Sequence, residues 1–218
     1  MNPQARRFDF LIWIGVVITL LILLLAYLLA QLRLRETIGR PLPILGQVQD
    51  FRLTNQVGQV VTLADLRGRV WVADIIFTRC AGPCPRMTRQ IREIQQALPA
   101  TSTAKLVTLT TDADFDTPPV LKAYADKFGA DPKRWMFLTG DKRQVANLAI
   151  DSLKLTAVEK KPEERLAPED LFVHSTIFVV VDKLGRLRGV FETDGEGVSP
   201  MKARALILAA VKRLELER

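Results

Sequence analysis

The chain has 218 residues, which is enough for one well-packed domain and additional segments. Hydrophobic residues make up 48% of it, and 31 Lys+Arg against 24 Asp+Glu give a formal net charge of +7. The basic residues are interspersed with acidic ones rather than clustered, which argues against nucleic acid as a partner. We therefore expect most charges to form a solvated surface.

One segment near the N-terminus raises the hydrophobic content. Residues 11–30 include no charged side chain, and a helix of this length would span the hydrocarbon core of a bilayer, about 30 Å. The residues that follow show no small-residue cleavage pattern, so a retained anchor is a better interpretation than a signal peptide. We predict a short cytoplasmic N-terminus over 1–10, a single membrane span over 11–32 and a linker over 33–46.

The flanking charges leave the orientation of this span open. Arginines precede the segment, and three more follow it at Arg33, Arg35 and Arg40, so the positive-inside rule does not decide the matter. Large C-terminal domains are translocated largely regardless of such charges. The linker arginines are expected to touch anionic lipid headgroups, each weakly.

From residue 47 to the C-terminus, apolar runs typical of strands alternate with helical patterns. The predicted strands are 50–53, 59–63, 70–77, 105–111, 135–138, 177–181 and 187–191, of which the first two and the last two form hairpins. The predicted helices lie over 85–98 and 116–128, and from 141 and 200 onward. The charged segment 158–169 contains two prolines and is predicted to be a loop. This order suits a thioredoxin-like α/β fold, with a central mixed sheet flanked by helices.

Both cysteines lie where the central strand 70–77 ends and a helix begins. Pro85 suits the first helical position, which places Cys84 at the N-cap and Cys80 one short loop earlier. Unpaired N–H groups and the positive end of the helix dipole favour thiolate at such a position. Because thiolate attacks disulfides and binds metals, the sequence predicts a site of sulfur chemistry here.

The spacing of this pair leaves several functions open. Redox-active thioredoxins carry C-x-x-C, whereas three residues separate Cys80 from Cys84. A loop of this length still allows a disulfide or a redox pair, and it also leaves room for an ion between the sulfurs. Two ordinary buried cysteines are the remaining alternative.

The chain contains one histidine, His174, which precedes the apolar run 177–181. A lone histidine is ordinarily a polar loop residue. However, two thiolates and one imidazole suit copper, since thiolates prefer Cu(I) and imidazole suits either oxidation state. Zinc would usually recruit a fourth ligand.

The expected topology brings these residues to one edge of the sheet. The cysteine loop follows the carboxyl end of a parallel strand, and the strand after His174 should run antiparallel to it. His174 can therefore reach the cysteines. Thioredoxins carry a cis-proline just before this strand, but here the run is His-Ser-Thr, which favours metal binding over disulfide exchange.

Four motifs, in this order along the chain, resemble those of the SCO/SenC family, and the similarity runs from about Gln47 to the C-terminus. They are Phe77-Thr-x-Cys80-x-x-x-Cys84-Pro85, Thr110-Thr-Asp112 with Asp116-Thr-Pro118-x-x-Leu121-x-x-Tyr124, Phe137-Leu-Thr-Gly140, and His174-Ser-x-x-Phe178. Members of this family are membrane-anchored thioredoxin-fold proteins that deliver copper to cytochrome c oxidase. Three features depart from the family pattern: Ala81 replaces a frequent proline, Gly82-Pro83 replaces a more polar pair, and Val173 replaces a common aspartate.

The resemblance implies that Cys80, Cys84 and His174 ligate one copper ion per chain, as Cu(I) or Cu(II). The implied partners are the copper-receiving subunit of the oxidase and other copper donors. The resemblance also implies that the domain 47–218 lies on the outer face of the membrane, which is the periplasmic side if the source is bacterial.

Two other functions would use the same residues. One is that of a thiol-disulfide oxidoreductase, in which Cys80 and Cys84 reduce the cysteines of the oxidase copper site. The other is that of a membrane-tethered copper sensor that relays to a partner.

Further polar and soft residues surround the cysteine motif in the sequence. Asp112, Asp114 and Asp116 are expected as helix caps and turn formers rather than as a carboxylate cluster. Met87 is expected in the core, with an extra copper contact as the alternative. Asp74 lies inside the central strand and must find a partner if it is buried.

Overall fold

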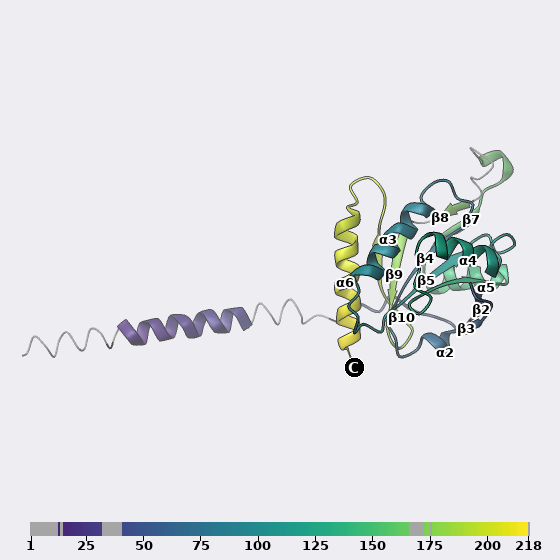
Figure 1. Ribbon diagram of the computed structural model, residues 1–218. Helices are drawn as coiled ribbons and strands as arrows, with labels where there is room; N and C mark the ends of the chain where they lie inside the picture. Colours follow the sequence, from purple (N-terminus) through teal and green to yellow (C-terminus); the bar gives the residue numbers. More distant parts are fainter. Residues whose placement is uncertain (1–12, 14, 32–40, 166–171, 175, 218) are drawn as a thin grey trace, which may run out of the picture. The chain divides into compact units, whose positions relative to one another are not determined.

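The computed structural model describes residues 13, 15–31, 41–165, 172–174 and 176–217, with the backbone alone at 157–159, 162 and 172–174. The chain divides into two compact units, residues 1–41 and 42–218 (Figure 1). In the first, residues 15–31 form a helix. Among the described residues, no helix combines the length and the apolar character needed to cross a membrane. The predicted N-terminus 1–10 and parts of the predicted span 11–32 and linker 33–46 lie outside the described residues.

The second unit is built around an eight-stranded mixed sheet of order β1-β10-β9-β4-β5-β6-β2-β3. Its strands are β1 (Gly46–Gln47), β2 (Arg52–Asn55), β3 (Val60–Thr62), β4 (Trp71–Ile76), β5 (Lys105–Thr110), β6 (Trp135–Thr139), β9 (Ile177–Val181) and β10 (Arg186–Glu192). A second, two-stranded sheet pairs β7 (Ala157–Glu159) with β8 (Phe172–His174). Strands β4, β5 and β6 are parallel, and β9 runs antiparallel to β4. The chain therefore has the thioredoxin-like α/β arrangement expected from its sequence.

Helices cover both faces of the large sheet. They are α2 (Leu63–Leu66), α3 (Cys84–Ala97), α4 (Pro118–Lys127), α5 (Lys142–Ala146) with its π-helical continuation η1 (Asn147–Ser152), and α6 (Pro200–Leu216). The 3₁₀ turn η2 (Pro162–Glu164) lies in the connection between β7 and β8. Helices α3, α4 and α6 contribute to one apolar core, whereas α2, α5 and η1 contribute to the other. Figure 1 shows α6 beside α3, and the two helices are in contact.

The two cores meet across β4, which is buried on both faces. Val72 and Ile76 point into the core with α3, whereas Trp71, Ala73 and Ile75 point into the core with α2. Successive side chains of a strand alternate between faces. A continuous apolar run is therefore what a central strand of this kind requires.

Most of the predicted elements are confirmed, including the β2–β3 and β9–β10 hairpins. The prediction of a loop over 158–169 is wrong in part, because β7 and η2 lie within that segment. Strand β7 forms because β8, which follows a long connection, pairs with it. Composition within the segment gives no sign of that pairing. Residues 166–169 lie outside the described residues.

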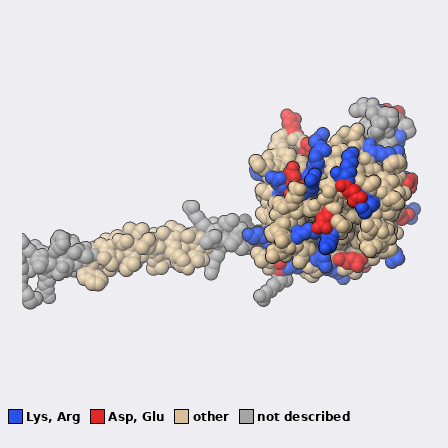
Figure 2. Space-filling view, in the orientation of Figure 1, with Lys and Arg blue, Asp and Glu red and all other residues tan. Residues whose placement is uncertain are grey.

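Figure 2 shows how the charged side chains are distributed on one face of the protein. Basic and acidic side chains alternate over the folded domain, without a large area of one sign. This face agrees with the interspersed pattern of charges in the sequence.

Candidate metal centre

The two cysteines lie in the turn from β4 into α3, at the carboxyl end of β4. The predicted helix start is wrong by one residue: Pro83 is the N-cap, Cys84 the first helical residue and Pro85 the second. The Pro83 carbonyl accepts from Met87 N at 3.0 Å, which starts the helical hydrogen bonding there. The Cys80 N–H donates to the Phe77 carbonyl at 3.2 Å and closes the turn before the helix.

Both sulfurs are buried and reduced, with Cys80 8% exposed, Cys84 0% exposed and no disulfide between them. A hydrogen bond with the Cys80 thiol, and then burial, raise the pKa of the Cys84 thiol above its ordinary value. This corrects the expectation that the helix start would favour thiolate. The hydrogen bond with the neighbouring thiol favours the protonated sulfur, and burial disfavours the charged one. A metal that binds here must displace protons.

Asp116 forms hydrogen bonds with Thr78, the residue two places before Cys80. It is fully buried, and it accepts hydrogen bonds from Thr78 N at 3.0 Å, from Thr78 Oγ1 and from Thr110 Oγ1. Burial raises the pKa of Asp116, against the lowering effect of these hydrogen bonds. The loop that follows β5 thereby fixes the start of the cysteine turn.

The other two acids of this group have different roles. Asp112 pairs with Arg79 at 2.5 Å, and the Arg79 guanidinium lies 4.1 Å from the centroid of the Phe115 ring. Asp114 is exposed and pairs with Lys142 at 2.5 Å. The expectation of turn-forming acids is confirmed for Asp112, whose carbonyl accepts from Phe115 N. Sequence reasoning missed Arg79, although it stands beside Cys80 within the motif.

A second polar layer lies beneath the thiols. Thr88 Oγ1 donates to the Cys84 carbonyl at 2.8 Å and shares a hydrogen bond of 2.9 Å with Tyr124 Oη. Asp74 is fully buried and accepts from Thr108 Oγ1 at 2.6 Å, which supplies the partner expected for it. Met87 is fully buried in the core, as predicted.

His174 ends β8, where it is the register partner of Ala157. Strand β9 begins three residues later and pairs antiparallel with β4, with Val72 opposite Val180. The N-terminal end of β9 therefore meets the carboxyl end of β4, which is the sheet edge that carries the cysteines. The expected topology is confirmed.

Contacts also join the segment after His174 to the cysteine helix. The Thr176 hydroxyl donates to the Asp194 carbonyl at 3.1 Å, and the Asp194 carboxylate pairs with Arg86 of α3 at 2.6 Å. The side chain of His174 lies outside the described residues. Among the side chains that are described, no group of three or more His, Cys, Asp or Glu could hold a metal ion. The structure thus brings Cys80 and Cys84 together, and the joint site with His174 stays a prediction.

The comparisons with known proteins agree on one family. The family model described as SCO1/SenC matches residues 46–206. A Bacillus subtilis protein named SCO1 protein homolog is 34% identical over 147 residues, which are 66% of this chain and 73% of that protein.

Two solved structures are similar over most of the folded unit. BsSco, described as a member of the Sco family of cytochrome c oxidase assembly proteins with a disulfide switch, has a TM-score of 0.67 and 28% identity, covering 82% of this chain and 100% of that one. Bradyrhizobium japonicum ScoI with copper bound has a TM-score of 0.61 and 24% identity, covering 77% and 99%, and shows the shared fold. On the extent of the family match and the similarity to the Bacillus subtilis protein, this chain belongs to the SCO1/SenC family.

Proposed function

We propose that this protein is a membrane-anchored copper metallochaperone. It would hold one copper ion through Cys80, Cys84 and His174 and deliver it to the copper centre of cytochrome c oxidase. The observation that carries the proposal is a pair of buried, hydrogen-bonded thiols at the sheet edge where the strand after His174 begins. Copper is the cargo of such a protein, and hence its substrate.

The chemistry of the donors supports this cargo. Two deprotonated sulfurs are soft ligands that suit Cu(I), and an imidazole suits both oxidation states. Transfer would proceed by ligand exchange, as donors of the oxidase copper-receiving subunit replace the sulfurs. The copper-bound relative supports the cargo, and the description of BsSco supports the acceptor. Other copper donors would load the protein.

The first test is a titration of the reduced full chain with Cu(I) under anaerobic conditions. We expect one copper per chain. His174→Ala should weaken Cu(II) binding more than Cu(I) binding, because two thiolates alone still form a linear Cu(I) site. Two tightly held ions per chain, or unchanged Cu(II) binding in the variant, would contradict the proposed ligand set.

The second candidate is a thiol-disulfide oxidoreductase, which the disulfide switch of BsSco favours. Cys80 and Cys84 would pass two electrons and two protons to a disulfide of the oxidase copper site and become a disulfide themselves. Oxidase activity in cells separates the candidates. A chaperone needs all three ligands, so His174→Ala should impair oxidase nearly as much as Cys80→Ser, with partial rescue by added copper. Full activity of His174→Ala beside an inactive Cys80→Ser would favour the oxidoreductase.

The proposed anchor rests on the uncharged residues 11–30. The full chain should stay with membranes after a carbonate wash, with its N-terminus uncut and the domain on the outer face. A released form that begins near Gln31 would identify the segment as a signal peptide instead.

A further inference from the structure

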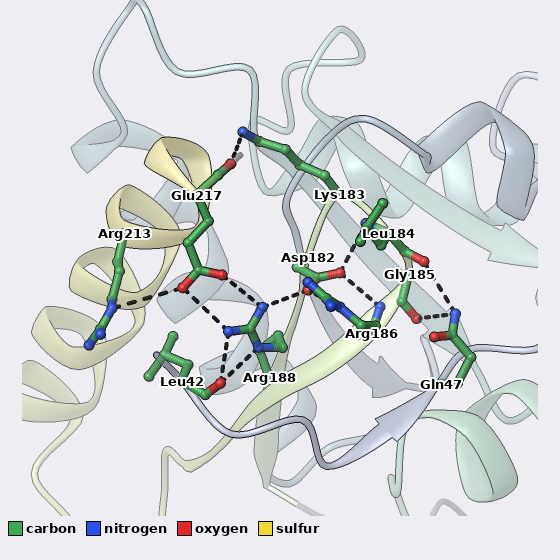
Figure 3. A network of polar contacts seen from close by, with 10 residues as sticks. All are labelled: Leu42, Gln47, Asp182, Lys183, Leu184, Gly185, Arg186, Arg188, Arg213 and Glu217. Atoms are coloured by element: carbon green, nitrogen blue, oxygen red, sulfur yellow. Dashed lines mark hydrogen bonds and ion pairs between the residues drawn. The ribbon is translucent and has the colours of Figure 1, made fainter. Parts of the chain in front are cut away.

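Leu42, the first residue of the folded unit, lies at the end of the sheet opposite the cysteines. Arg188 of β10 is buried, and it donates to the Leu42 carbonyl from Nε at 3.1 Å and from Nη2 at 2.7 Å (Figure 3). Its Nη1 pairs with Asp182 at 2.7 Å and with Glu217, just after α6, at 2.9 Å. Through Val181, this end of β10 adjoins Trp71, the first residue of β4. The cysteines follow the last residue of β4.

A basic pocket lies at the same end of the domain. It has a volume of about 350 Å³ and is lined by Arg69 before β4, Lys105 at the start of β5, and Lys133 and Arg134 before β6. Gly68, which also lines it, donates to the Lys183 carbonyl at 2.8 Å. Lys183 Nζ in turn donates to the Glu217 carbonyl (Figure 3) and to the Glu215 carbonyl. The pocket therefore adjoins the network around Arg188.

Asp131 attracts Lys105 at longer range, but the four cations of the basic pocket are not held in ion pairs. No carboxylate of the described residues lies within ion-pair distance of any of them. Of the acids nearby, Glu215 accepts from Thr103 N at 2.9 Å and Ala104 N at 3.1 Å, and Asp131 accepts from Lys133 N at 2.9 Å.

The cations also crowd one another. Arg134 Nη1 is enclosed and makes no hydrogen bond within the described structure. Burial, and then the positive charges of Arg69 and Arg134, lower the pKa of Lys105. Like charges held around a hollow repel one another, and an anion bound between them would relieve that repulsion.

The chain itself indicates which anion is within reach. The predicted span is free of charge as far as Ala30, twelve residues before Leu42, and twelve residues extend to at most about 40 Å. Three arginines in between are expected to meet anionic headgroups. We propose that the basic pocket binds the phosphate group of an anionic phospholipid, so that this end of the domain rests on the bilayer and the cysteine end faces away from it. The proposal rests on the proposed membrane anchor, but it goes beyond copper transfer and does not depend on it.

The test uses the full chain reconstituted into vesicles of phosphatidylcholine, with or without about a quarter of phosphatidylglycerol. The rate of acetylation of Lys105 by an amine-reactive ester is measured by mass spectrometry. We expect acetylation to be roughly fivefold slower in the anionic vesicles, while the exposed Lys122 on α4 is unaffected. The double variant Arg69→Gln/Lys133→Gln should abolish this protection and still bind Cu(I).

A matched control removes the same charge from the other end of the domain. Arg89→Gln/Lys202→Gln changes two exposed cations on α3 and α6, and it should keep the protection of Lys105. Equal acetylation of Lys105 in both vesicles would overturn the proposal. So would equal protection by inorganic phosphate with phosphatidylcholine alone, which would identify a free-phosphate site. Failure of the chain to float with either vesicle would overturn it as well.

Discussion

The surroundings of the Cys80–Cys84 pair favour protonated sulfur. The positive end of the α3 dipole would stabilise a thiolate. However, a hydrogen bond with the neighbouring thiol, and then burial, raise the pKa of Cys84. The sequence places both cysteines correctly at the strand-to-helix turn. It does not reveal how deeply they are enclosed, because burial depends on α4 and β9, which come from distant parts of the chain.

Cu(I) affinity should therefore rise with pH. Because Cys84 has a raised pKa, its proton is still bound near neutrality and must leave when copper binds. We expect the apparent affinity to rise about tenfold per pH unit for each thiol proton released, as measured by competition with a chromophoric Cu(I) chelator. Cys84→Ser should reduce this slope, and an affinity that is independent of pH would show that thiolates are already formed.

Asp116 should contribute more to stability than Asp114, although the two look alike in the sequence. Asp116→Ala leaves the buried donors of Thr78 and Thr110 without an acceptor, which should lower the free energy of unfolding by about 2–3 kcal/mol. Asp114→Ala removes only an exposed pair, which contributes less than about 1 kcal/mol. Urea denaturation measures both, and equal losses would contradict the role assigned to Asp116.

The pH dependence of Asp116 has a defined sign. Its folded pKa is raised, so its contribution to the free energy of unfolding is present below the unfolded pKa and is lost as pH rises through the folded value. Asp116→Asn cannot titrate. In this variant, the free energy of unfolding should vary less with pH across that acidic range.

Among the elements that sequence patterns miss, the small β7–β8 sheet lies nearest to His174 in the chain. The segment before His174 is charged and rich in proline, which ordinarily indicates a loop. A backbone pairing between Ala157 and His174 nevertheless forms across the intervening residues. Local sequence patterns indicate which residues can form a strand, whereas the fold of the whole chain determines which other strand pairs with it.

Disturbing β7 should affect the histidine without affecting the sulfurs. Ala157→Pro removes a backbone donor and restricts the backbone opposite His174. We expect Cu(II) affinity to fall about tenfold or more, while Cu(I) binding changes little. Ala157→Ser keeps the backbone and serves as the control. An equal loss of Cu(I) and Cu(II) binding would mean that the substitution disturbs the cysteine turn as well.

For the molecule as a whole, stability depends on apolar cores on both faces of one sheet. The continuous apolar run of β4 and the periodic patterns of the main helices predict this architecture, because the run marks a strand buried on both faces and each helical pattern marks the face that must be buried. The burial of Arg188 and its partners could not be predicted in the same way. Its sequence neighbours suggest a solvated charge, and its partners Leu42, Asp182 and Glu217 come from three separate segments.

Two adjacent residues of α6 allow a direct test of the core. Ile207 is 0% exposed, whereas Leu206 is 50% exposed. Ile207→Ala should lower the free energy of unfolding by about 2–5 kcal/mol, because it leaves a cavity beneath the sheet. Leu206→Ala should change it by less than about 0.5 kcal/mol. Thermal or urea unfolding distinguishes the two, and similar losses would mean that α6 packs differently from the arrangement seen here.

The network around Arg188 also determines how a mechanical load would pass through the domain. A pull on the N-terminal segment reaches the fold at Leu42, and Arg188 passes it to β10 and to the end of α6. The turn with Cys80 and Cys84 lies at the far end of β4, outside that path. Tension on the N-terminal segment would therefore strain the contacts of Arg188 first, and the sulfur pair would keep its geometry while the domain is pulled.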